Sequence, residues 1–87
     1  MVALNRAVAV AMAFGPAAGL ELVDELAGEP ALRAYHLVPS VRGDLLAKLG
    51  RGDEARMEFE RAAALTRNAR ERDLLTQRAA EFMRQSS

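Results

Sequence analysis

Five stretches of the chain repeat apolar residues at intervals of three and four, the spacing that places side chains on one face of an α-helix. They cover residues 2–14, 16–27, 31–49, 53–66 and 69–84, and glycine, proline or asparagine separates them. The alternation of β-branched residues that is typical of strands is missing. The pattern therefore predicts an all-α protein with five helices.

Several residues mark where these helices should end or bend. Gly50 suits a left-handed C-cap, and Asp53 and Asn68 are good N-caps for the helices that follow them. Pro39 lies inside the predicted helix 31–49. Because proline lacks a backbone donor and its ring crowds the preceding turn, we expect this helix to be kinked at Pro39 rather than divided in two.

The predicted helices pair into two hairpins, residues 2–28 and 31–66. Gly15 and Gly50 hold the same place, between the two helices of each pair, and they are 35 residues apart. That separation is close to the 34-residue period of a tetratricopeptide (TPR) repeat. The sequence thus contains two related units, of which the first is the more degenerate.

The second hairpin resembles the second half of the TPR pattern. Its small and aromatic residues fit a single register of that pattern, namely Gly43, Leu46, Gly50, Ala55, Phe59 and Ala62. The Trp expected early in the first helix is absent, and Pro39 stands there; an ordinary helical hairpin is the alternative. We predict one TPR-like domain over residues 1–87, in which helix 69–84 caps a stack of two antiparallel hairpins.

The first predicted helix, residues 2–14, is apolar nearly all round. Such a helix is expected to be buried on two sides. A preceding segment, a second copy or a partner would then cover it. We therefore expect the chain to be a fragment of a longer protein.

In TPR-like folds the first helix of each hairpin lines a concave binding face. On that face we expect residues from 2–14 and from 31–49, namely Asn5, Ala9, Met12, Ser40, Asp44, Ala47 and Lys48. Asn5 is the polar residue most out of place on its helix. It either holds the backbone or carboxylate of a bound peptide or pairs with a group of its own chain, and both alternatives are open.

Composition argues against several other classes of function. The 12 basic and 12 acidic residues give a net charge of zero, so we do not expect this domain to bind nucleic acid by itself. Without cysteine there is no disulfide or Cys-zinc site. His36 is the only histidine and has no catalytic partner at a suitable spacing. We expect neither an enzyme nor a metal or cofactor site.

Two further segments have a simple interpretation. The arginines of residues 67–72 are diluted by Glu71 and Asp73 and indicate a solvated helix start, with a contact to an acidic partner as the alternative. The apolar run of residues 7–20 is interrupted and too short to span a bilayer. We therefore expect a protein partner and no membrane.

Four segments carry a resemblance to a known family: LNRAVAVA, GPAAGLELVDEL, AYHLVPSVRGDLLAKLGRGDEARMEFERAAAL and NARERDLLTQRAAE. Together they resemble the C-terminal TPR-like extension of a bacterial group of extracytoplasmic-function (ECF) sigma factors, over nearly the whole chain. Asn5-Arg6-Ala7-Val8, Tyr35-His36, Leu49-Gly50 and Glu71-Arg72 carry the similarity, and Pro39 departs from it.

The resemblance implies a cytoplasmic regulatory module of transcription initiation. In that family the sigma domains that bind promoter and RNA polymerase lie N-terminal to this segment. The implied partners are those sigma domains, RNA polymerase or a signalling protein. A stand-alone adaptor that forms a homodimer through residues 2–14 is the alternative.

Overall fold

The computed structural model describes residues 2–32 and 35–85, with side chains over 4–32 and 35–82. The described residues form five α-helices and one short 3₁₀ helix. They are α1 (Val2–Phe14), α2 (Pro16–Ala27), η1 (Pro30–Leu32), α3 (Leu37–Lys48), α4 (Gly52–Leu65) and α5 (Ala69–Gln85). The predicted all-α fold with five helices is confirmed.

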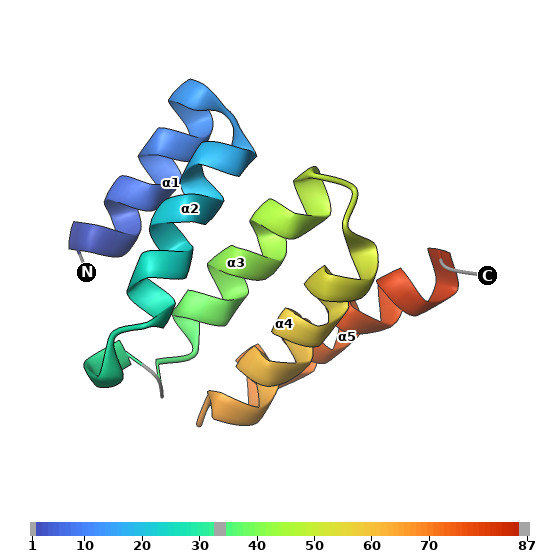
Figure 1. Ribbon diagram of the computed structural model, residues 1–87. Coiled ribbons are helices and arrows are strands. Elements are labelled where there is room, and N and C mark those ends of the chain that lie inside the picture. The colour runs from blue at the N-terminus through green and yellow to red at the C-terminus, as the bar shows by residue number, and fades with distance from the viewer. Residues whose placement is uncertain (1, 33–34, 86–87) are drawn as a thin grey trace.

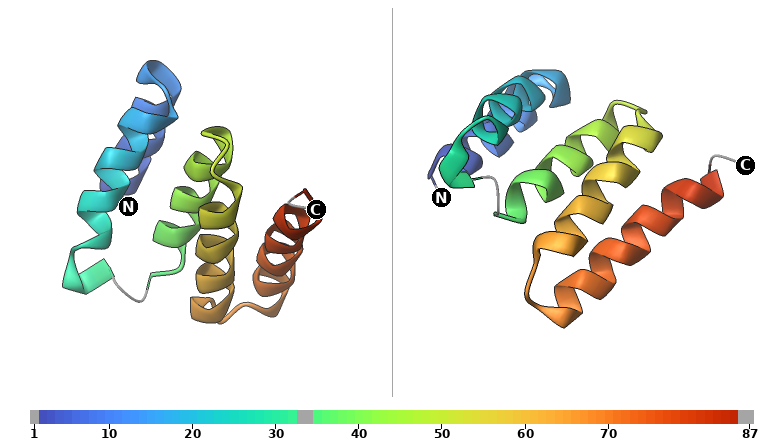
Figure 2. Two further views of the ribbon diagram at one scale, coloured as in Figure 1. Left: turned by 45° about the vertical axis from the view of Figure 1, so that its right-hand side comes forward. Right: turned by 60° about the horizontal axis from the view of Figure 1, so that its bottom comes forward.

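The helices stack in the order in which they occur in the chain (Figure 1). α1 and α2 form one antiparallel hairpin, α3 and α4 form the next, and α2 packs against α3. α5 lies along α4 on the side away from α2, as two further views show (Figure 2). This is the predicted TPR-like stack, in which α5 covers the C-terminal end.

The start of the third helix differs from the prediction. α3 begins at Leu37, and residues 30–32 form the separate η1 turn instead; residues 33–34 of the predicted helix lie outside the described residues. Pro39 is therefore in the first turn of α3, where backbone N–H groups have no helical acceptor in any case. The predicted kink at Pro39 is wrong, because the chain breaks before the proline and starts a new helix there.

Both hairpin turns depend on a glycine with positive φ. Gly15 has φ 101° and Gly50 has φ 77°, a region that residues with a Cβ rarely adopt. At the second turn the Arg51 N–H donates to the Leu46 carbonyl at 2.9 Å, and the Gly50 N–H donates to the Ala47 carbonyl at 3.1 Å. These two bonds form a Schellman motif. The predicted left-handed cap at Gly50 is confirmed.

The two predicted N-caps have different outcomes. The Glu71 N–H donates to Asn68 Oδ1 at 3.1 Å, so Asn68 caps α5 as predicted. Asp53 instead lies within the first turn of α4, whose cap position is Arg51 without a side-chain hydrogen bond. The predicted cap at Asp53 is wrong, although its carboxylate there still suits the helix dipole.

Phe59 of α4 occupies the centre of the second hairpin and is fully buried. A Cβ on Gly43 of α3 would lie only 2.9 Å from the Phe59 ring, so the glycine lets the two helices close on the aromatic side chain. On the other side the Phe82 ring of α5 stacks on Phe59 with centroids 5.8 Å apart. One aromatic residue thus holds three helices together.

In the first hairpin, too, a glycine lets the two helices approach closely, but the contact is a different one. A Cβ on Gly19 of α2 would lie 2.5 Å from the Ala11 Cβ and 2.9 Å from the Ala7 carbonyl oxygen of α1. The two backbones therefore meet almost directly. This contact takes the place of the Phe59 ring, which fills the space between the helices of the second hairpin.

Candidate functional site

The free side of α1 is unusually apolar for an exposed helix. Leu4 and Ala7 face the core, whereas seven other residues are exposed: Asn5, Arg6, Val8, Ala9, Met12, Ala13 and Phe14. Only one of the seven is charged. Met12 is 83% exposed and Phe14 is 79% exposed. A helix that faced only water would carry charged residues here, so this surface suits a protein contact.

This surface continues into a hollow of about 210 Å³ between α1 and α3. We call it the α1–α3 groove. Its apolar walls are Val8, Ala11, Met12, Pro16, Val41 and Leu45, and two charged side chains, Asp44 and Lys48, also line it. Of the seven residues predicted for the binding face, the fold brings Met12, Asp44 and Lys48 together in this groove.

The two charged residues of the groove differ in their surroundings. The carboxylate of Asp44 pairs with Arg78 of α5 at 2.5 Å, and the same guanidinium lies 4.5 Å from the centroid of the Phe59 ring. Asp44 is therefore neutralised by a cation that is itself held in place. Lys48 is exposed at the last turn of α3, and within residues 4–32 and 35–82 no carboxylate pairs with it.

The other predicted site residues lie outside the groove. Asn5 and Ala9 are exposed on α1 beside it. The Ser40 hydroxyl donates to the His36 carbonyl at 3.0 Å, a local bond within the first turn of α3. Ala47 is half-buried and does not line the groove.

His36 has a structural partner that the sequence did not indicate. Its Nε2 lies 2.7 Å from Oε1 of Glu71, and its ring meets the Tyr35 ring edge-on. Glu71 is three residues after the Asn68 cap, where a capping-box glutamate would turn back to the cap. It reaches His36 instead, and this contact ties the start of α3 to the start of α5.

Arg42 joins three helices on another surface. Its guanidinium contacts Asp24 of α2 at 2.7 Å and Glu58 of α4 at 3.1 Å, beside a second hollow of about 280 Å³. Burial alone would lower the pKa of Arg42, but the hydrogen bond that Arg42 donates to Asp24 and the charges of Asp24 and Glu58 outweigh it and raise that pKa. This network could not be predicted from the sequence, because it depends on the register of three helices.

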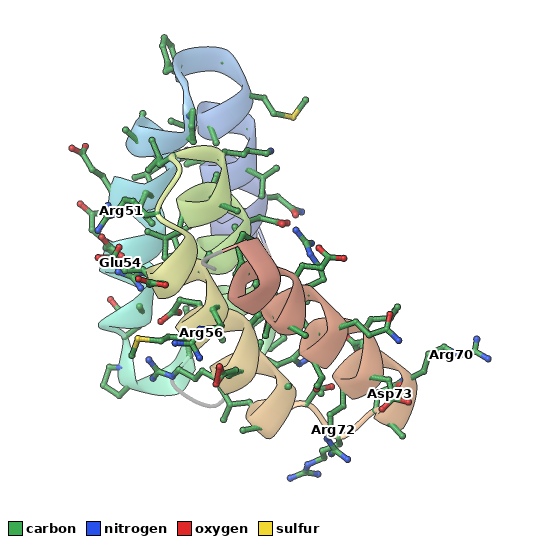
Figure 3. The ribbon with its side chains drawn as sticks, turned by 90° about the vertical axis from the view of Figure 1, so that its right-hand side faces the viewer. Arg51, Glu54, Arg56, Arg70, Arg72 and Asp73 are labelled. Carbon is green, nitrogen blue, oxygen red and sulfur yellow. The ribbon has the colours of Figure 1, made fainter. Side chains whose placement is uncertain are left out.

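The arginines before and within α5 do not form a joint patch. Arg72 donates to the Ala63 carbonyl at 3.3 Å and to the Thr66 carbonyl at 2.8 Å, which are free acceptors at the end of α4. Arg70 is exposed and points away from the molecule (Figure 3). Arg72 thus secures the turn between α4 and α5, while Arg70 is solvated.

Two other kinds of site are absent from the described part of the chain. None of its helices is both long and apolar enough to cross a bilayer. Nowhere among these residues do three histidine, aspartate or glutamate side chains gather as they would around a metal ion.

Comparison with known proteins adds one relative. No protein-family model and no solved structure matches the chain significantly. The chain is 51% identical over 71 residues to an uncharacterized protein of Rhizobium meliloti (strain 1021). The match covers 82% of this chain but only 16% of that protein, so the chain spans a small part of this relative's length.

Proposed function

We propose that this domain is a protein-interaction and regulatory module of a bacterial ECF sigma factor, and that it acts in the cytoplasm through its α1 surface. The observation that carries the proposal is the nearly uncharged free side of α1, which continues into the α1–α3 groove. The sequence resemblance gives the class of protein. The match to a small segment of a much longer relative is consistent with a module within a larger chain.

The size of the surface favours a partner that is held nearby. α1 has 13 residues and is about 20 Å long, so its free side offers on the order of 200 Å². A stable complex of separate proteins buries about 800 Å² on each partner. A tethered partner meets the surface at an effective concentration near millimolar, which makes a small contact sufficient. Sigma domains of the same polypeptide satisfy this condition, and RNA polymerase bound to them does so as well.

The test is in vitro transcription by the full-length sigma factor with this domain intact, deleted, or carrying Met12→Lys. Met12 is 83% exposed, so the charge should not unfold the domain. Met57→Lys is the matched control, because Met57 is 63% exposed on α4 and does not line the groove. Lower transcription from the deletion and from Met12→Lys would indicate that the module helps initiation, and higher transcription would indicate a brake. Transcription equal to wild type from both would refute the proposal.

A self-associating adaptor is the second candidate. The exposed Met12 and Phe14 favour it, since both side chains would be covered in a dimer formed through α1. The small area of α1 is against it. Sedimentation at high protein concentration decides between the two, because a strictly monomeric mass removes the dimer.

A further inference from the structure

The α1–α3 groove has a shape that accepts one large apolar side chain. Its volume of about 210 Å³ exceeds the roughly 150 Å³ of a cavity that binds benzene. Val8, Met12 and Leu45 line it, so an aliphatic or aromatic side chain would replace water there favourably.

The charges around the groove determine which charge a bound partner should carry next to that apolar side chain. Asp44 is already paired with Arg78, so it attracts no further cation strongly. Lys48 lines the same groove, is exposed, and pairs with no carboxylate among the described side chains. The local surface is therefore apolar with one uncompensated positive charge, which is complementary to an apolar segment that carries a carboxylate.

The form of the partner follows from the surface beside the groove. Ala9 and Ala13 are exposed on α1 one turn apart, and their short side chains leave room for a helix backbone to approach. Ala7 and Ala11 of α1 have the same spacing, and α2 already packs against them at Gly19. An extended peptide would turn only every second side chain toward α1, so its side chains could not form the continuous ridge with which a helix packs.

We propose that the α1–α3 groove binds an amphipathic helix that inserts one large apolar side chain between Met12 and Leu45 and places a carboxylate at Lys48. The inference rests on the proposed function and adds the chemistry of the partner to it. Met12 and Leu45 provide the apolar contact that gives the affinity, and Lys48 makes the groove prefer a negatively charged partner.

The experiment uses two synthetic helical peptides of alanine and glutamine that differ at one position. Each carries two leucines four residues apart, with either glutamate or lysine one turn further along. Fluorescence anisotropy at low salt measures the Kd of each peptide for the protein. We expect the glutamate peptide to bind roughly tenfold more tightly than the lysine peptide, since one charge pair is attractive and the other repulsive.

Two charge variants test whether Lys48 is responsible. Lys48→Glu should reverse the order of the two peptides. Arg70→Glu changes the net charge equally but lies on α5 and points away from the molecule, so it should leave the order unchanged (Figure 3). Equal binding of both peptides, or a preference that survives Lys48→Glu, would overturn the inference.

Failure to bind either peptide at protein concentrations up to about 1 mM, the effective concentration of a tethered partner, also overturns it. Self-association of the protein that Met12→Lys abolishes does so too, because a second copy would then occupy the groove. These outcomes remain separate from the proposed function. A change in transcription on Met12→Lys in the full-length sigma factor would still support a regulatory contact, with a partner of different chemistry.

Discussion

Replacing Gly43 by alanine should destabilise the domain, although alanine is the better helix former. In the interior of an exposed helix this change gains about 1 kcal/mol. Here the new Cβ would lie 2.9 to 3.1 Å from three carbons of the Phe59 ring. The ring is fully buried and in contact with Phe82 and Arg78 of α5, so it has little room to move. Overpacking of this kind costs about 1–3 kcal/mol, and we expect a net loss of about 1 kcal/mol.

Urea unfolding of the purified protein, followed by circular dichroism, measures the free energy of unfolding. Gly28→Ala is the matched control, because Gly28 is exposed with φ −79° and its Cβ would come no closer than 3.5 Å to Glu25. The control should be neutral or slightly stabilising. If Gly43→Ala proves more stable than wild type, the close contact with Phe59 is wrong. Gly43→Ala should cost less free energy of unfolding in a Phe59→Leu background than in the wild type, because the smaller side chain leaves room for the added methyl group.

Further substitutions test other contacts. Gly19→Ala should cost about 2 kcal/mol or more in urea unfolding, since its Cβ would overlap α1 at 2.5 Å. Gly50→Ala should cost about 1–2 kcal/mol in the same assay, because alanine would have to adopt φ 77°. Glu71→Ala removes the bond to His36 and should lower stability by about 1 kcal/mol, with faster amide hydrogen exchange in α5 as its signature. Arg42→Met should cost about 1 kcal/mol. Because the folded-state pKa of Arg42 is raised above its ordinary, already strongly alkaline value, its contribution is complete at every lower pH, so that cost should be equal at neutral and mildly alkaline pH.

Local sequence signals were sufficient for most helix boundaries. The helices 2–14 and 16–27 were predicted with the bounds that the structure gives, because Gly15 separates two clear helical patterns and then needs a positive φ. The start of α3 was missed because Leu32 and Tyr35 continue the helical spacing of Leu37, although Leu32 belongs to η1 and Tyr35 precedes the first residue of α3. The periodicity of apolar residues indicates which face of a helix is buried, but it does not indicate the residue at which the helical hydrogen bonds of the backbone begin or end.

The groove was only half predictable for a related reason. Met12, Asp44 and Lys48 share it because their helices were paired correctly, but the sequence could not say that Arg78 would neutralise Asp44. The choice of partner for a long side chain depends on the exact placement of several helices. The pairs of Arg42 and His36 escaped prediction on the same ground.

The two ends of the stack differ in both polarity and attachment, and this difference favours α1 as the helix that responds to a partner. α5 is fixed to the rest by side-chain contacts of Glu71, Arg72 and Arg78, and among its described side chains only Leu74 is large, apolar and exposed. α1 is held mainly by its close contact with α2, and its free side is apolar. A partner helix on that side would bury Met12 without breaking any ion pair seen in the described residues. Binding would therefore cost no existing ion pair among the described residues. Its free energy would depend on the apolar fit and on the charge opposite Lys48.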